Sequence, residues 1–339
     1  MSLEFRHIAH AYGPVGALED ISFTARTGEI TCLLGSSGCG KSTLLNLAAG
    51  LLNVQHGSIL LNDEVLADPS RNPPPEDRPV GIVFQDGALF PHMTIGANVG
   101  FGIDEPGSVM IERWLERVGL GGLSDRYPHQ LSGGQQQRAA LARAMAPHPE
   151  VLLMDEPFAS VDIVLRRRLR RDCRILLREQ GTTAVLVTHD PDEALDVADR
   201  IAVMDAGRIV QFGTPSDLHD CPAAASVGAM FGGAQVVRAR REGERLRTAF
   251  GIWPRGCIIG ELPEAEELDL LVLADRIDLA RDPEGMAVRD VHLMGEGARL
   301  VLSGRDEEEL TVETDTPPSG DAKYQATPRA GSIRAFAVN

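Results

Sequence analysis

The residues best suited to chemistry in this chain form a short glycine-rich loop at positions 35–43, with the sequence GSSGCGKST. The loop matches the pattern G-x-x-x-x-G-K-[ST], in which backbone N–H groups surround phosphate oxygens. In such a loop Lys41 reaches the terminal phosphates and the Ser42 hydroxyl binds Mg²⁺. The chain has 33 basic residues but only two lysines, Lys41 and Lys323. A guanidinium is too wide for the loop, so the ammonium at 41 indicates a nucleotide site. The remaining candidate ligands in the loop are Ser36, Ser37, Gly38, Cys39, Gly40 and Thr43.

The segments on either side of the loop support this interpretation. Residues 29–34 (EITCLL) are predicted to form a buried strand, and residues 42–49 (STLLNLAA) a helix that closes at Gly50. The phosphate-loop pattern requires this strand–loop–helix context. The N-terminus of the helix adds the positive end of its dipole to the anion site.

Three further apolar segments each end in a polar residue. Residues 80–84 (VGIVF) lead to Gln85, residues 151–154 (VLLM) to Asp155 and Glu156, and residues 182–187 (TTAVLV) to Thr188 and His189. Taken singly, the two acids could cap the next helix, and a lone histidine at a strand end is usually structural. Ligands of open α/β sheets bind along the carboxyl edge of the strands, which favours a shared site. There Asp155 would hold Mg²⁺ and Glu156 would polarise an attacking water.

A second anion cradle is predicted at LSGGQ, residues 131–135. Ser132 is a good N-cap for a helix running to Pro147, and Gly133 and Gly134 leave backbone donors exposed beside Gln135. One nucleotide pocket has little use for two such cradles unless the second serves another copy of the protein.

Tyr12 is the only aromatic residue in residues 9–18, a predicted loop between strands at 3–8 and 21–26. Its ring could form a platform for an adenine base, or it could be an ordinary half-buried tyrosine. The spacing alone does not separate these two roles.

Composition limits the class of protein. The chain has 339 residues, is 43% hydrophobic and carries a formal net charge of −16, which argues against non-specific binding to nucleic acid or anionic lipid. Five scattered cysteines without C-x-x-C spacing favour reduced thiols over a zinc site. We expect no membrane span and no signal peptide. The basic run at 166–171 (RRRLRR) and the acidic run Glu307 to Glu309 are expected to be solvated surfaces.

The composition changes near residues 232–233, which divides the chain into residues 1–232 and 235–339. From residue 235 onward, short strand candidates separated by Gly/Pro turns predict a small β-barrel or sandwich. These candidates lie at 236–240, 269–274, 288–294, 299–302, 310–313 and 332–338.

Taken together, residues 3 to about 232 resemble the ATP-binding subunits of ABC transporters. The resemblance rests on the phosphate loop, Gln85 in the position of the Q-loop, LSGGQQQR at 131–138, VLLMDEP at 151–157 and His189. It implies an α/β P-loop NTPase fold with an antiparallel β subdomain and a helical subdomain at about 86–150. It departs from the common SALD sequence at Ala159-Ser160-Val161-Asp162, which leaves the tuning of communication between subunits open.

The resemblance also implies roles. Tyr12 would stack on adenine, Gln85 would sense Mg²⁺ and the γ-phosphate, Glu156 would be the general base, and His189 would contact the γ-phosphate. Ser132, Gly133, Gly134 and Gln135 would complete the ATP site of the opposite copy in a homodimer. Permease subunits in the inner membrane would be the partners at the cytoplasmic face, with Leu89-Phe90-Pro91 as the docking segment. A solute-binding protein would take part indirectly.

The C-terminal part resembles the OB-type regulatory domain of importer ATPases, and LLVLADRIDLA at 270–280 resembles a weakened form of its motif. The sequence leaves open whether this domain binds a regulatory ligand or supports dimerisation. Within importers the segments 84–94, 126–150 and 188–215 look most like ferric-iron systems. Polyamine, thiamine, phosphonate, sulfate and sugar importers share much of this pattern. An ABC ATPase acting on nucleic acid or ribosomes is disfavoured by the acidic charge, and a catalytically inactive subunit by Glu156 and His189.

Overall fold

The structure, a computed structural model, describes residues 1–103, 106–159, 161, 163–231, 233–316 and 322–338. Its contacts divide the chain into two units, Met1–Ser216 and Asp217–Asn339. The sequence placed this boundary at 232–235, where the composition changes. The difference arises because helix α8 (Ala225–Met230) packs on strands β11 (Ala234–Glu242) and β14 (Glu267–Leu273), with Gly228 leaving room for Leu271.

A six-stranded sheet forms the centre of the N-terminal unit, in the order β10-β9-β3-β8-β7-β6. All neighbours pair in parallel except β10 with β9, which form a hairpin. β3 and β8 are buried along their whole length, as their continuous apolar sequences predict. The strand bounds are β3 Ile30–Leu34, β6 Val80–Val83, β7 Val151–Asp155, β8 Thr183–Thr188, β9 Arg200–Asp205 and β10 Arg208–Gly213.

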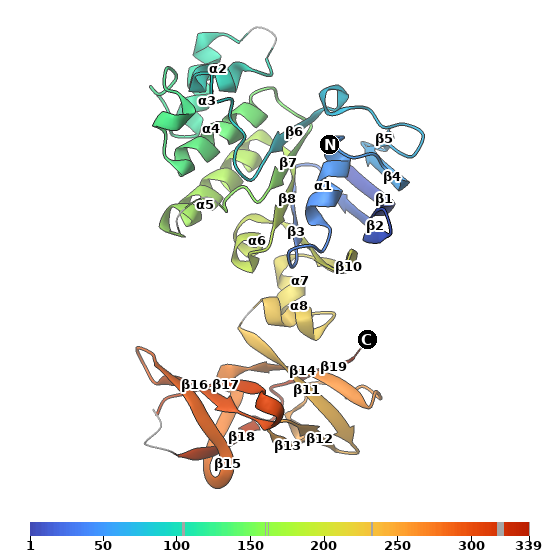
Figure 1. Cartoon of the computed structure of the whole chain (residues 1–339), viewed down its shortest axis with the longest axis vertical. Helices are drawn as coiled ribbons and strands as arrows, with labels where there is room; N and C mark the ends of the chain where they lie inside the picture. Colours follow the sequence, from blue (N-terminus) through green and yellow to red (C-terminus); the bar gives the residue numbers. More distant parts are fainter. Residues whose placement is uncertain (104–105, 160, 162, 232, 317–321, 339) are drawn as a thin grey trace. The chain divides into compact units, whose positions relative to one another are not determined.

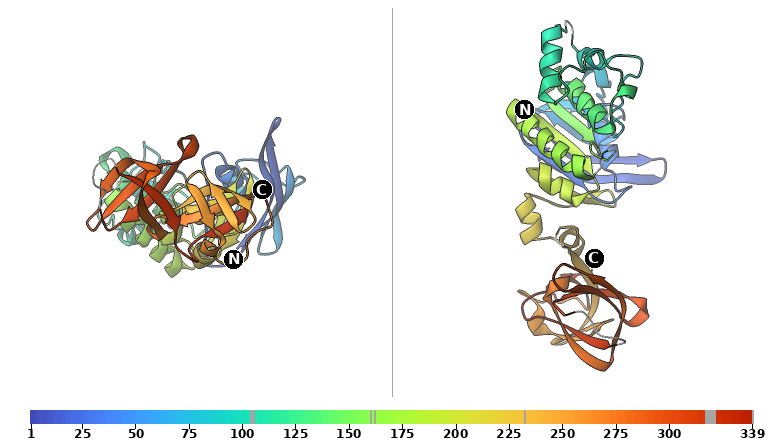
Figure 2. Two further views of the ribbon diagram at one scale, coloured as in Figure 1. Left: turned by 90° about the horizontal axis from the view of Figure 1, so that it is seen from below. Right: turned by 90° about the vertical axis from the view of Figure 1, so that its left-hand side faces the viewer.

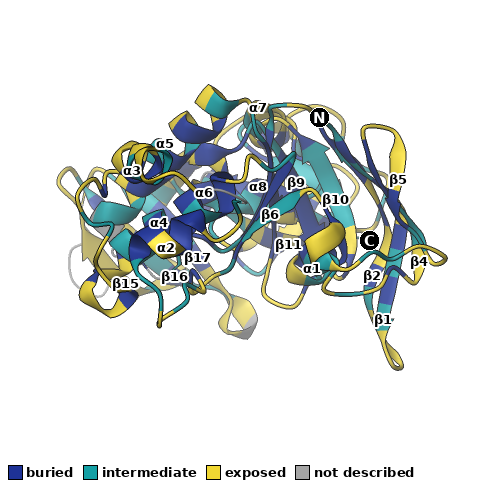
Figure 3. Cartoon of the chain, turned by 90° about the horizontal axis from the view of Figure 1, so that it is seen from above, coloured by how far each residue is buried: buried dark blue, intermediate teal, exposed yellow. Residues whose placement is uncertain are grey.

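A second, antiparallel sheet has the order β2-β1-β4-β5. Its strands are β1 Leu3–Tyr12, β2 Val15–Ala25, β4 His56–Leu61 and β5 Glu64–Ala67. The expected loop at 9–18 is much shorter, because the strands continue to a tight turn at Gly13 and Pro14. Figure 2 shows this hairpin in blue, and Figure 3 shows its tip as exposed.

The described helices of the N-terminal unit are α1 Lys41–Ala49, α2 Ile95–Gly100, α3 Ser108–Arg117, α4 Gly133–Met145, α5 Ile163–Gln180 and α6 Pro191–Val197. Figure 1 shows α2, α3 and α4 grouped together, within the range expected for a helical subdomain. In α3, Trp114 and Leu115 face the core, whereas Val109 is 68% exposed.

Two antiparallel sheets form the body of the C-terminal unit, in the orders β13-β12-β11-β14-β19 and β17-β16-β15-β18. The additional strands are β12 Arg245–Thr248, β13 Gly251–Pro254, β15 Ile277–Leu293, β16 Ala298–Ser303, β17 Glu309–Thr314, β18 Lys323–Pro328 and β19 Arg334–Ala337. Alternating apolar side chains of both sheets form one core around Trp253, whose indole N–H donates to Ala326 O at 3.0 Å. A short helix, α7 (Pro215–Asp220), precedes α8. The prediction of an all-β C-terminal body is confirmed.

Candidate functional site

The phosphate loop connects β3 to α1 as predicted, and its glycines are required by geometry. Gly38 and Gly40 have φ angles of 85° and 102°, in the left-handed region that favours glycine. A Cβ on Gly40 would also lie 2.5 Å from Ala17 O. Ser36, Ser37 and Gly38 are exposed at the tip of the loop, whereas Cys39 is only 3% exposed and packs into the core.

Lys41 is the first residue of α1 and is 5% exposed. Its Nζ donates to Gly35 O at 2.8 Å and to Ser36 O at 2.9 Å, and it lies 3.7 Å from the Sγ of Cys39. The ammonium is therefore held within the ring of the loop. Together with the N-terminus of α1, it places fixed positive charge where a phosphate would lie.

A hydrogen bond between two side-chain oxygens joins the loop to the end of β7. Ser42 Oγ donates to Asp155 Oδ1 at 3.1 Å. Burial raises the pKa of the Asp155 carboxyl and the charge of Glu156 adds to this effect, while the Ser42 hydrogen bond and the Lys41 ammonium lower it. Magnesium prefers oxygen ligands and is usually held by one or two protein groups together with substrate phosphates and water. These two oxygens fit that requirement.

Glu156 follows directly and lies beside the predicted histidine. His189 Nδ1 is 2.9 Å from Glu156 Oε1, so a protonated Nδ1 donates to the carboxylate. Glu156 has a φ of 43°, unusual for a residue with a side chain, and its N–H donates to Val187 O at 3.0 Å. The imidazole of His189 is 55% exposed and the Glu156 side chain 21%. The structure thus brings together the acid and the histidine, which follow β7 and β8, two paired strands that are neighbours in Figure 1.

Tyr12 ends β1 and is 51% exposed. Its hydroxyl lies 3.4 Å from Thr43 Oγ1 in α1, and its ring packs edge-on against His10 with centroids 4.9 Å apart. The aromatic ring is therefore next to the phosphate loop. An exposed ring in this position can stack on a planar base.

Gln85 follows β6 and is held by α4. Gln137, which is 5% exposed, donates from Nε2 to Gln85 O at 3.1 Å. Arg143 donates to Ala88 O at 2.8 Å and to Gly87 O at 3.2 Å, with its guanidinium 5.2 Å from the centre of the Phe90 ring. The loop after Gln85 is therefore attached to this helix at several points.

The same helix begins at the second cradle. Ser132 caps α4: its hydroxyl accepts from Gln135 N, and Gln135 Oε1 accepts from Ser132 N at 2.9 Å, a capping box. Ser132 and Gly133 are exposed. Gly134 is buried, and a Cβ there would lie 2.5 Å from Leu165 Cδ2. In Figure 1, α4 and α1 lie on opposite sides of β6, β7 and β8, so the central sheet separates the helices that begin at the two cradles.

Sequence reasoning missed several residues that shape the site. Arg170 was assigned to a solvated face, but it is 4% exposed and contacts three carboxylates. Asn98 is fully buried and its side chain bonds to the backbone of Phe90, Met93 and Thr94. For Arg170, the available signal was the four-residue spacing of arginines in residues 166–178, which places them on one face of a helix. Ser160 and Asp162, in the segment that departs from the SALD sequence, lie outside the described residues.

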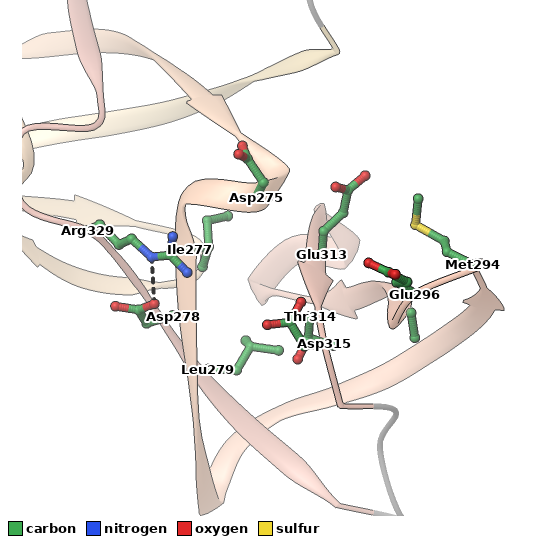
Figure 4. Close-up of a pocket in the computed structure, with 11 residues that line it drawn as sticks. Asp275, Ile277, Asp278, Leu279, Met294, Glu296, Glu313, Thr314, Asp315 and Arg329 are labelled. Carbon is green, nitrogen blue, oxygen red and sulfur yellow. Dashed lines mark hydrogen bonds and ion pairs between the residues drawn. The ribbon is translucent and has the colours of Figure 1, made fainter.

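The C-terminal unit contains a cleft of about 600 Å³, shown in Figure 4. Five carboxylates line it, against one guanidinium, Arg329, which donates to Asp278 at 2.8 Å. This charge repels a triphosphate, which favours the N-terminal unit as the place for a nucleotide. Among the described residues, no group of three or more His, Cys, Asp or Glu side chains could hold a metal ion. The carboxylates are Asp275, Asp278, Glu296, Glu313 and Asp315.

Comparisons with known proteins agree with this geometry. Residues 18–159 match the family model described as ABC transporter. A sulfate/thiosulfate import ATP-binding protein of Chromobacterium violaceum is 40% identical, over 94% of this chain and 88% of that protein. An Fe(3+) ions import ATP-binding protein of Rhodococcus jostii is 46% identical, over 74% of this chain and 73% of that protein. A spermidine/putrescine import ATP-binding protein of Roseobacter denitrificans is 40% identical, over 85% of this chain and 79% of that protein.

Solved structures give the same result. An ATP-binding cassette of an ABC transporter in its ADP conformation superposes with a TM-score of 0.59 at 25% identity, covering 67% of this chain and 98% of that one. A nucleotide-free ATP-binding cassette from an ABC transporter gives a TM-score of 0.56 at 26% identity, covering 63% of this chain and 92% of that one. The likeness extends over about the length of the N-terminal unit.

Proposed function

The chain belongs to the ATP-binding subunits of ABC importers, which hydrolyse ATP to power transport, and we propose that it works as a homodimer closed around ATP. In this proposal, the phosphate loop of one copy and Ser132 to Gln135 of the other hold each triphosphate. The observation that carries it is the placement of Ser132 and Gly133: both are exposed at the start of α4, and Ser132 forms a capping box with Gln135 of the same helix. In the proposed dimer, the second chain supplies the anion for this exposed cradle.

Within each site, Lys41 and the loop N–H groups bind the β- and γ-phosphates. Ser42 and Asp155 would hold Mg²⁺, which would neutralise charge on the phosphates, and Gln85 would lie beside them. Tyr12 stacks on the adenine ring. The Ser42–Asp155 hydrogen bond supports the proposed Mg²⁺ site, and the contact of Tyr12 with Thr43 supports the proposed adenine site.

The reaction is hydrolysis of the terminal phosphate. Glu156 accepts a proton from the attacking water and so raises its nucleophilicity. His189, bonded to the Glu156 carboxylate, keeps this carboxylate oriented and contacts the γ-phosphate. Once the γ-phosphate has left, the two cradles lose their shared anion. The closed dimer then loses the differential affinity that ATP gave it, and it opens.

The motion passes to permease subunits at the cytoplasmic face of the membrane, where the chain is a peripheral subunit. Among the residues described by the structure, no helix is long and apolar enough to cross a bilayer. We place the dock at Leu89-Phe90-Pro91, where Pro91 is exposed and Leu89 and Phe90 are partly exposed. Asn98 and Arg143 fix this segment, so it moves together with α4.

Ferric iron is the proposed cargo, delivered by a solute-binding protein. Of the relatives described above, the Fe(3+) protein has the highest identity. Sulfate is the second candidate because the sulfate/thiosulfate protein aligns over 94% of the chain, which includes most of the C-terminal unit. For that unit we propose an OB-type regulatory domain.

The dimer is tested with Glu156→Gln, which retains the size of the side chain but removes the base. With Mg²⁺ and ATP, sedimentation should show a stable dimer, and adding Ser132→Glu should abolish it by placing a carboxylate against the triphosphate. A dimer unaffected by Ser132→Glu would contradict the proposed interface.

The cargo is tested with the transporter reconstituted in proteoliposomes. Its ATPase should be stimulated by a binding protein loaded with ferric iron and not by one loaded with sulfate or spermidine. The reverse result would reassign the cargo and leave the ATPase mechanism intact.

A further inference from the structure

Helix α5 carries four arginines at four-residue intervals, which places them on one face. Their guanidinium groups bond to three segments that reach the nucleotide site. We propose that the second of them, Arg170, is a positioning residue for His189: it fixes the end of β8 so that the imidazole meets Glu156. This inference rests on the role proposed above for His189. The four arginines are Arg166, Arg170, Arg174 and Arg178.

Arg170 is held from three sides. Its NH2 group lies 2.5 Å from Asp190 Oδ2, its Nε 3.4 Å from Glu193 Oε1, and its NH1 3.3 Å from Asp196 Oδ2. The side chains of Arg170 and Glu193 are each 5% exposed. A planar guanidinium can reach three acceptors at fixed angles, which the ammonium of lysine cannot do.

These contacts reach both chain neighbours of His189. Thr188 Oγ1 donates to Glu193 Oε2 and accepts from Asp190 N at 3.0 Å. Asp190 caps α6, accepting from Asp192 N at 3.0 Å and Glu193 N at 3.4 Å. Because the His189 side chain is 55% exposed, little packing holds its ring. The position of the imidazole therefore depends on the backbone that Arg170 fixes through Asp190 and Glu193.

The other arginines attach α5 to neighbouring segments. Arg166 donates to Val161 O at 2.9 Å and to Ala159 O at 3.3 Å, in the turn after Glu156. Arg174 lies 3.3 Å from Asp199 Oδ1, and Arg178 bonds to the same carboxylate. Asp199 Oδ2 in turn accepts from Ile30 N at 3.0 Å, at the start of the strand that leads into the phosphate loop. The helix thus joins the turn after Glu156, the His189 segment and the base of β3.

Removing the guanidinium leaves three carboxylates, one of them buried, without their shared cation. Their mutual repulsion and the desolvation of Glu193 favour a shift of α6 away from α5. The phosphate loop is untouched, so ATP binding should survive while turnover falls. A lower kcat with an unchanged KM is the result expected when a group that acts in the transition state is disturbed.

The experiment compares Arg170→Met with Arg171→Met, an exposed neighbour on the same helix, in the full chain. Arg170→Met should lower kcat roughly ten-fold, or about 1.4 kcal/mol, with the KM for ATP changed less than about two-fold. Arg171→Met should match the wild type. In a His189→Ala background, where residual turnover is followed with radiolabelled ATP, Arg170→Met should cause little further loss.

A wild-type kcat for Arg170→Met, or an equal fold loss with and without His189, would overturn the inference. If Arg170→Met does not fold, Arg170→Lys and Glu193→Gln take its place, with the same cycle against His189→Ala. If residual turnover is too low, the NMR signals of the His189 ring in Arg170→Lys and Arg171→Met decide: only the former should shift. If His189→Ala alone retains full turnover, the proposed role of His189 fails instead, which separates the two failures.

Discussion

The phosphate loop can be tested by adding a single methyl group at Gly35. This residue does not have a positive φ, so its backbone conformation accommodates alanine, and the obstacle is space alone. A Cβ built there would lie 2.2 Å from Met204 O and 2.8 Å from Cys39 Sγ. Contacts below 3.0 Å are essentially never found for real Cβ atoms. Either the loop or strand β9 must therefore move.

The loop is the part expected to yield. Met204 pairs with Ile209 of β10, and it belongs to β9, which also pairs with β3 as far as Val203, so the strand is held by a neighbour on each side. The loop must shift by about 1 Å, and overpacking of this kind costs about 1–3 kcal/mol of unfolding free energy. Because Gly35 O accepts from Lys41 Nζ, the shift also moves the ammonium. A misplacement of about 1 Å in a catalytic site lowers activity on the order of 100-fold.

Gly35→Ala is measured by urea unfolding, by titration with a fluorescent ATP analogue and by steady-state ATPase. The matched control is Gly16→Ala in β2, where a Cβ would meet no atom within 4 Å. We expect Gly35→Ala to lose nucleotide affinity and turnover, and Gly16→Ala to keep both. Wild-type affinity and stability in Gly35→Ala would refute the steric argument, as would equal losses in the two variants.

Three further predictions concern other parts of the chain. Glu156→Gln should lower turnover by about 10²- to 10⁴-fold with ATP binding retained, and near-normal turnover would remove Glu156 from the role of base. Burial raises the pKa of the Cys173 thiol to about 12 and raises those of Cys32 and Cys257, so these three should react slowly. An alkylator should modify exposed Cys221 first and next Cys39, whose Sγ lies 3.7 Å from the Lys41 ammonium. In Cys221→Ser, inactivation should be slow and ATP should slow it further; an ATP-independent rate would contradict the placement of Cys39. Arg143→Met should cost about 2 kcal/mol in urea unfolding and reduce permease-stimulated ATPase more than basal ATPase, and an equal reduction of both would count against the docking segment.

The parts of the site that the sequence predicted are those set by local pattern. The phosphate loop, Asp155 and Ser132 each belong to a contiguous motif beside an apolar strand or a helix start, and the structure places them accordingly. Residues such as Gln137 and Asn98 were missed because their contacts cross long intervals of sequence or are made to backbone atoms. No local pattern records which carbonyl a side chain will reach.

In the C-terminal unit, strands β12, β13 and β18 lie outside the strand candidates predicted from the sequence, for a different reason. β12 has the sequence RLRT and β18 the sequence KYQATP, in which charged and polar residues alternate with few apolar ones. Only Leu246 and Thr248 of β12 are buried, so the periodic signal spans two positions. The sequence could not predict the boundary between the two units at residue 216, because α8 joins the C-terminal unit by packing on β11 and its composition does not indicate this.

The attachment of α4 and α5 bears on how two ATP sites in the proposed dimer would act together. α4 presents Ser132 at its N-terminus and holds the backbone of Gln85 and Gly87 through Gln137 and Arg143. In the proposed dimer, a displacement at Gln85 would therefore move the cradle offered to the other site. α5 likewise connects the turn after Glu156 to the His189 segment. In the proposed dimer, these attachments connect each ATP site to the cradle offered to the other, so we expect the two sites to close and open as a pair.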